Sequence, residues 1–162
     1  MRIQRCFTVE GHSPYESIPF RTATSEIRNP DGSVVFHLDD IQVPAEWSQV
    51  ASDILAQKYF RKAGVAAKLK PVEEETVPSW LWRHVPDEEA LAALPEEEHY
   101  GPEKDARQVF NRLAGTWTYW GWKGGYFNDE DDAQAFYDEM RFMLAAQISA
   151  PNSPQWFNTG LH

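Results

Sequence analysis

The residues best suited to chemistry are few and scattered along the sequence. There is one cysteine, Cys6, and no base or pKa-lowering partner for it is identifiable, so we expect an unreactive thiol. The five histidines share no i, i+3 or i+4 spacing, and nothing local supplies convergent ligands. We therefore expect surface or hydrogen-bonded histidines and no metal site. They are His12, His37, His84, His99 and His162.

A stiff polar segment near the C-terminal end is better suited to binding. In Pro151-Asn152-Ser153-Pro154 two prolines restrict the backbone, while the Ser153 hydroxyl and the Asn152 amide can donate to an anion or a ribose hydroxyl. Composition alone favours an ordinary helix-ending turn over a binding loop, and it leaves both interpretations open.

The first elements that could position this segment lie in the N-terminal half. Residues 1–21 lack a clear period and predict an extended arm. Thr22 to Leu38 predicts a β-hairpin, because Asn29-Pro30-Asp31-Gly32 has the composition of a tight turn. Pro44 to Ala63 predicts one helix, whose buried stripe would consist of Trp47, Val50, Ala51, Ile54, Leu55 and Tyr59.

An acidic segment rich in proline follows, from Pro71 to Gly101. Like-charge repulsion and missing amide donors disfavour long regular structure there, so we expect an irregular and mobile linker. One short helix is expected at Asp87 to Leu94, and Ser79-Trp80-Leu81-Trp82 is the expected docking point.

Two further helices are expected in the C-terminal half. One begins at Pro102 and has Gly115 as its candidate stop. The segment Thr116 to Phe127 holds six aromatic residues, which we interpret as a structural plug between helices. The other helix has Asn128 as its N-cap and ends before Pro151. The expected fold is therefore mainly α, with one small hairpin.

Charge and composition exclude several classes of function. The formal net charge is −10, and Pro71 to Asp105 holds eleven Asp/Glu against two Lys/Arg, so the acidity belongs to one segment. A polymer of nucleic acid would require a basic surface, and the aromatic segment contains only Lys123 as a basic residue. No apolar run approaches the length of a membrane span, and a cytoplasmic protein is expected.

Three runs of residues resemble one family of enzymes. Ala150 to Leu161 reads APNSPQWFNTGL, Leu113 to Phe127 reads LAGTWTYWGWKGGYF, and Asp53 to Val65 reads DILAQKYFRKAGV. All three are similar to the adenosylcobalamin-dependent (class II) ribonucleotide reductases. The resemblance extends from about Arg21 to His162 and is weakest in the acidic segment.

The resemblance implies an enzyme that reduces ribonucleotides to 2′-deoxyribonucleotides for DNA synthesis. In that family adenosylcobalamin generates a cysteine thiyl radical inside a ten-stranded α/β barrel, and a cysteine pair supplies the reducing equivalents. Residues 22–162 would form the N-terminal domain packed on that barrel, and 151–162 would begin the substrate loop. Ser153 is then the expected contact to the ribonucleotide substrate, and Asn152 is a weaker candidate.

The same resemblance implies what this segment does not contain. It stops before every cysteine that does chemistry in the family, so we expect no catalytic residue within it. The segment alone should be inactive and should not hold adenosylcobalamin tightly. Its expected partners are the catalytic barrel and the ribonucleotide, and assembly into a homo-oligomer is left open. The alternative interpretation is a non-catalytic helical protein-interaction module.

Overall fold

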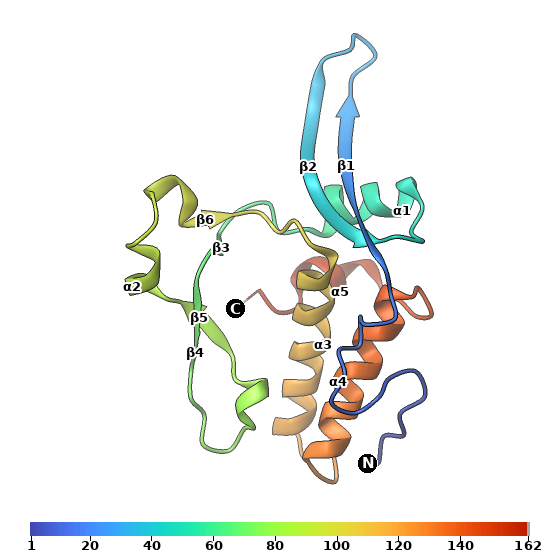
Figure 1. Ribbon diagram of the computed structural model, residues 1–162, viewed down its shortest axis with the longest axis vertical. Helices are drawn as coiled ribbons and strands as arrows, with labels where there is room; N and C mark the ends of the chain where they lie inside the picture. Colours follow the sequence, from blue (N-terminus) through green and yellow to red (C-terminus); the bar gives the residue numbers. More distant parts are fainter. Residues whose placement is uncertain (162) are drawn as a thin grey trace.

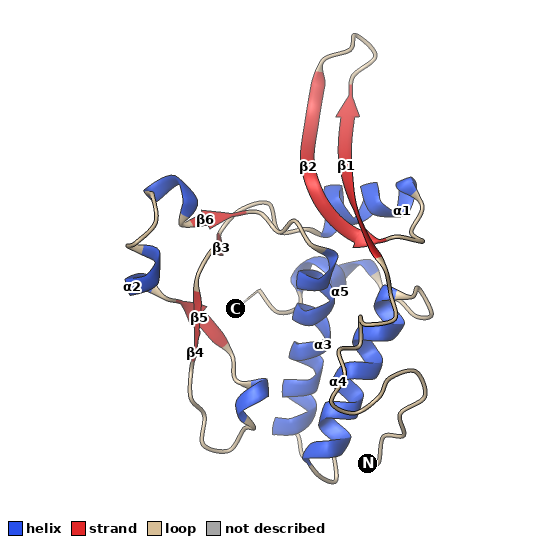
Figure 2. Ribbon diagram, viewed as in Figure 1, coloured by secondary structure: helices blue, strands red, loops and turns tan. Residues whose placement is uncertain are grey.

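A computed structural model describes residues 1–161 of the chain. A β-hairpin projects from a group of helices, and a lobe of short elements lies to one side (Figure 1; Figure 2). The elements in chain order are β1 (Phe20–Arg28), β2 (Val34–Pro44), α1 (Gln49–Ile54), the π-helix η1 (Leu55–Tyr59), β3 (Val65–Ala66), β4 (Leu69–Pro71), the 3-10 helix η2 (Ser79–Leu81), β5 (His84–Pro86), α2 (Glu88–Leu91), the 3-10 helix η3 (Glu96–Glu98), β6 (Tyr100–Gly101), α3 (Ala106–Lys123), α4 (Glu130–Ala145) and α5 (Ser153–Asn158).

The expectation of a mainly helical fold is wrong. Helix accounts for 38% of the chain and strand for 19%, so the fold mixes both. The hairpin is longer at both ends than expected, and the acidic segment contains two small antiparallel ladders, β3–β6 and β4–β5. Ladders of two or three residues are too short to show a period in the sequence, which is why the pattern did not predict them.

The hairpin turn lies where the sequence predicts it. The Asn29 N–H donates to the Ser33 carbonyl (2.8 Å), and Gly32 adopts a positive φ of 87°. Closer to the base of the hairpin, the register shifts between Ala23 and Ser25, opposite Asp39 and Asp40. Asp40 has a φ of 57°, so this irregularity is a β-bulge that bends the second strand.

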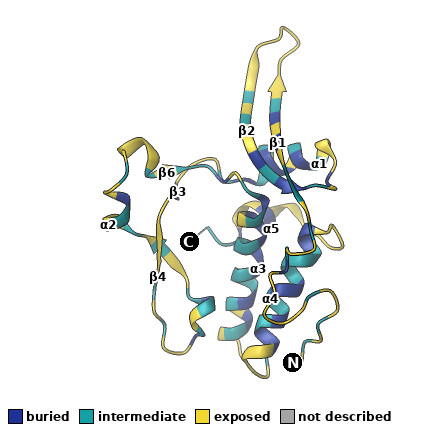
Figure 3. Cartoon of the chain, in the orientation of Figure 1, coloured by how far each residue is buried: buried dark blue, intermediate teal, exposed yellow. Residues whose placement is uncertain are grey.

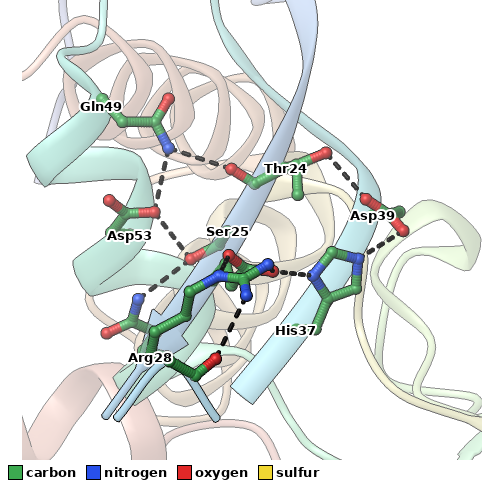
Figure 4. Close-up of polar contacts among 10 residues, drawn as sticks. Thr24, Ser25, Arg28, His37, Asp39, Gln49 and Asp53 are labelled. Atoms are coloured by element: carbon green, nitrogen blue, oxygen red, sulfur yellow. Dashed lines mark hydrogen bonds and ion pairs between the residues drawn. The ribbon is translucent and has the colours of Figure 1, made fainter. Parts of the chain in front are cut away.

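Polar contacts join the hairpin to the helix that follows it (Figure 4). The buried Ser25 hydroxyl donates to Asp53 (2.7 Å), and Gln49 donates both to Asp53 and to the Thr24 carbonyl (3.0 Å each). On the other face of the hairpin, His37 lies between the carboxylates of Glu26 and Asp39.

The helix expected from Pro44 to Ala63 is shorter and divided. Ser48 caps α1, which passes into the π-helix η1 and ends at Tyr59. The expected stripe is only partly correct, because α1 turns Ser52 toward the core and leaves Val50 and Ile54 exposed. Leu55 is 1% exposed, whereas Val50 is 67% exposed.

The long helix α3 extends past its expected stop. Asp105 and Gln108 form a capping box at its start, so it begins later than the predicted Pro102. Gly115 lies in the middle of the helix, next to the Tyr137 ring of α4, and therefore serves close packing and not termination. The aromatic segment is consequently helical as far as Lys123.

The last long helix, α4, is close to its prediction, with Asp129 as the N-cap in place of Asn128. It ends at Ala145, and Gln147 then turns the chain with a positive φ of 56°. Among residues 1–161, no helix has both the length and the apolar character needed to cross a membrane.

The core lies between the hairpin base, η1, α3, α4 and α5 (Figure 3). Its largest fully buried residues are Phe110, Ile41, Leu55, Leu113, Leu144, Val43 and Val109. The acidic segment docks beside α3 and α4. Trp80 takes part in this contact, as expected from the sequence. The Trp80 ring stacks on Tyr137 (5.9 Å between centroids), and the Trp122 indole donates to the Thr76 carbonyl (2.7 Å).

Candidate functional site

The Pro151–Pro154 segment forms the start of a short helix and not a continuous loop. Ser153 is the first residue of α5, and the Asn152 side-chain oxygen accepts a hydrogen bond from the Ser153 N–H (2.9 Å). Pro154 occupies the first turn, where a missing N–H costs nothing. Both predicted site residues therefore lie at one helix terminus, and Asn152 serves there as the cap.

The Ser153 hydroxyl is exposed and has one protein partner. The Tyr59 hydroxyl, at the end of η1, lies 3.0 Å from the Ser153 Oγ. The two residues are 94 positions apart in the sequence. A hydroxyl can donate one hydrogen bond and accept two, so Ser153 keeps capacity for a ligand beside this contact.

Stacked aromatic rings fix the position of α5. The Tyr59 ring stacks on Trp156 (centroids 5.3 Å apart, 15° between planes) and on Phe157 (6.4 Å, 20°). Trp156 is 7% exposed, and its indole N–H donates to the Pro151 carbonyl (3.0 Å). The turn that carries Ser153 is thus held from both its ends.

A buried ion pair between α3 and the residues before it also contacts the backbone of the Ser153 segment. The Arg112 guanidinium of α3 contacts the Glu103 carboxylate (2.9 Å), with side-chain exposures of 7% and 3%. Arg112 also donates to the backbone carbonyls of Trp156 (3.0 Å), Thr159 (2.8 Å) and Tyr59 (3.3 Å). One guanidinium therefore joins η1, α5 and the segment before α3.

The chain leaves α5 through a position that requires glycine. Gly160 has a φ of 73°, and a Cβ there would lie 2.5 Å from the Arg112 Cγ and 2.6 Å from the Thr116 Oγ1. A backbone this close to the helix α3 excludes any side chain at the position.

Sequence reasoning missed Tyr59, Glu103, Arg112 and Trp156 as parts of this site. Arg112 gave no signal, because an arginine two residues after Phe110 falls on the polar side of a predicted helix. Glu103 and Tyr59 gave none, since their partners are set by the tertiary fold.

The N-terminal arm is held by carboxylates on α4. The Arg5 guanidinium pairs with Asp138 (2.7 Å), and the backbone N–H and hydroxyl of Thr8 both donate to Glu139 (2.9 and 2.6 Å). The Ile3 N–H donates to Asp132 (2.7 Å). These three carboxylates are buried, so α4 provides a specific seat for an arm whose sequence showed no pattern.

This contact predicts a pH dependence of arm binding. Burial raises the pKa of Glu139, but hydrogen bonds from the Thr8 hydroxyl and from the N–H groups of Cys6, Phe7 and Thr8 lower it more, so the net shift is downward. A carboxyl with a lowered pKa stabilises the folded state above its unfolded pKa of about 4.3, and this contribution is lost as the pH falls through the folded value. We expect Phe7 and Thr8 amides to be protected from exchange near pH 6 and exposed near pH 3.

Hydrogen exchange corrected for intrinsic rates measures this release. In Glu139→Gln the side chain stays neutral, so protection of the Phe7 and Thr8 amides should be weaker and should depend less on pH than in the wild type, where Asp132 and Asp138 also hold the arm. Equal protection of the wild-type arm at both pH values would show that Glu139 does not control it.

The remaining candidates for chemistry have ordinary surroundings. Cys6 is a free, exposed thiol. His37 is exposed, and hydrogen bonds to Asp39 and then to Glu26 raise its pKa. His162 lies outside the described residues. Over 1–161, no three His, Cys, Asp or Glu side chains are grouped as metal ligands.

Comparison with known proteins identifies the family. Residues 21–147 match the family described as class II vitamin B12-dependent ribonucleotide reductase. A protein named vitamin B12-dependent ribonucleotide reductase from Bradyrhizobium diazoefficiens is 74% identical over all 162 residues, and one of the same name from Agrobacterium fabrum is 70% identical over all 162. Another of that name, from Rhodopirellula baltica, is 28% identical over 153 residues, which are 94% of the chain and 12% of that protein.

The chain spans 13% of the length of its Bradyrhizobium and Agrobacterium relatives. The family match runs from the hairpin strand β1 to the end of α4, and the two high-identity alignments also include the Ser153 segment. The chain therefore belongs to the class II vitamin B12-dependent ribonucleotide reductase family.

Proposed function

We propose that this chain is the N-terminal part of a ribonucleotide reductase that makes 2′-deoxyribonucleotides by cobalamin-initiated thiyl radical chemistry. In the net reaction the 2′-hydroxyl leaves as water while two enzyme thiols become a disulfide. The observation that carries the proposal is the 74% identity to a reductase across the entire chain. The same finding disfavours the alternative of a non-catalytic interaction module.

Within that enzyme, Ser153 is proposed to contact the bound ribonucleotide on its ribose or phosphate. Three features support this role: the hydroxyl is exposed, Pro154 restricts the backbone, and Tyr59 and Trp156 hold the turn. A turn that is ordered before binding loses little conformational entropy when the ligand arrives. Asn152 is proposed to act through its cap on α5.

The cofactor and the thiols are proposed to belong to the rest of the enzyme. Two cavities near the N-terminal arm have volumes of about 360 and 510 Å³, in the range of pockets that hold drug-sized ligands, and the much larger cobalamin does not fit in either. Cys6 is a single thiol, whereas reducing the ribonucleotide requires two thiols that are oxidised together to a disulfide. The cytoplasmic location and assembly into an oligomer stay predictions.

The test is Ser153→Ala in the full-length reductase. Loss of one neutral hydrogen bond costs about 0.5–1.5 kcal/mol, so the Kd for the ribonucleotide should rise roughly three- to tenfold. Adenosylcobalamin affinity should not change. The matched control is Ser149→Ala, because Ser149 is exposed in the same connection and precedes the turn. An unchanged Kd together with a lower melting temperature would mean that Ser153 has only a structural role.

A further inference from the structure

The Tyr59 side chain is half-buried against the core and is held by several neighbours. It ends the π-helix η1, where the Phe60 N–H returns to the Leu55 carbonyl (2.9 Å). π-Turns are rare and frequently occur at functional sites. Arg112 donates to the Tyr59 carbonyl, and Trp156 and Phe157 stack on the ring. The backbone and the ring of Tyr59 are therefore both fixed in position. These contacts do not involve the Tyr59 hydroxyl.

That hydroxyl points to a residue of the proposed substrate site. Its partner is the Ser153 Oγ at 3.0 Å, across two segments that meet only in the folded chain. A serine hydroxyl rotates freely about its C–O bond unless a neighbour selects one orientation. The phenol, with its ring clamped, provides that neighbour.

We propose that Tyr59 is a positioning residue for ribonucleotide binding, acting through the Ser153 hydroxyl. Its phenol occupies one side of the Ser153 oxygen and leaves the opposite side directed at the ligand. The role rests on the proposed function, because it needs Ser153 to contact the ribonucleotide. It differs from a structural role, because the ring alone provides the packing.

Tyr59→Phe in the full-length reductase tests the proposal, since it removes one oxygen and keeps the stacked ring. We expect the Kd for the ribonucleotide to rise roughly three- to tenfold, with adenosylcobalamin affinity unchanged. The melting temperature should change no more than in the control Tyr126→Phe. Tyr126 is 62% exposed and lies between α3 and α4, at the far end of α3 from α5 (Figure 1).

A double-variant cycle separates positioning from other roles. In a Ser153→Ala background, Tyr59→Phe should have no further effect on the Kd, because the residue through which it acts is gone. An additive effect would overturn the proposal by showing that Tyr59 acts independently of Ser153, and an unchanged Kd in Tyr59→Phe alone would also overturn it. If Ser153→Ala leaves the Kd for the ribonucleotide unchanged, Ser153 does not contact the ligand, and the proposal for Tyr59 is overturned as well. A wild-type enzyme that makes no deoxyribonucleotide would refute the proposed function itself.

Discussion

Replacing Arg112 by methionine is expected to lower the free energy of unfolding by about 3–5 kcal/mol, because it leaves a buried carboxylate without its partner. Glu103 is 3% exposed on its side chain and has Arg112 as its ion-pair partner. The substitution also removes the donors to the Trp156, Thr159 and Tyr59 carbonyls. Urea unfolding of the chain, followed by tryptophan fluorescence, measures the loss.

Two further variants give this prediction its controls. Arg107→Met removes the arginine of a partly exposed pair with Asp105, and should cost only about 0–1 kcal/mol. The double variant Arg112→Met with Glu103→Leu removes both buried charges together, and should recover part of the loss. If Arg112→Met costs no more than Arg107→Met, the ion pair does not hold the Ser153 segment in place.

The elements that the sequence predicted well carry local signals. The turn at Asn29–Gly32 has a proline with a preset φ and a glycine that adopts a positive φ. The helix α4 has an acidic first turn that follows a capping residue, so its start was predicted to within two residues. Both structures form from contacts between near neighbours in the chain, which is what a pattern can record.

The elements that the sequence missed depend on distant partners. Val65 pairs with Gly101 in β3–β6, and Leu69 pairs with Pro86 in β4–β5. The capping box at Asp105 overrode the earlier start suggested by Pro102, and close packing against Tyr137 explains the glycine that was interpreted as a stop. The capping box is a local contact that competed with the signal of Pro102, whereas the two ladders and the glycine depend on tertiary contacts.

The candidate site also contains residues with local sequence signals and residues whose contacts depend on the tertiary fold. Ser153 and Asn152 were predicted because the segment that contains them resembles a family signature and has the composition of a stiff turn. Tyr59 was expected on a buried helical stripe, and only the π-turn and the stacking on Trp156 bring its hydroxyl to Ser153. The supporting half of the site is therefore a property of the fold and not of any local motif.

Phe110→Ala is expected to destabilise the chain by about 3–5 kcal/mol, because it leaves a cavity at the point where the N-terminal and C-terminal halves meet. Phe110 is fully buried, and its ring lies 5.7 Å from Trp47 and 6.5 Å from Trp156 between centroids. Neither tryptophan can move into the space freely, since Trp47 donates to the Ala145 carbonyl and Trp156 to the Pro151 carbonyl. The cavity should therefore stay largely unfilled and the full cost should appear.

The measurement is urea unfolding together with near-ultraviolet circular dichroism, which reports the packing of the two tryptophans. Phe157→Ala is the matched control, because this ring is 44% exposed and stacks on the Tyr59 ring at the surface, so its loss of stability should be clearly smaller. Phe110→Ala should weaken the tryptophan signal before the helical signal, since the rings around the cavity loosen while α3 keeps its caps. Equal losses in the two variants, or an unchanged tryptophan signal in Phe110→Ala, would show that Phe110 does not couple the Ser153 segment to the core.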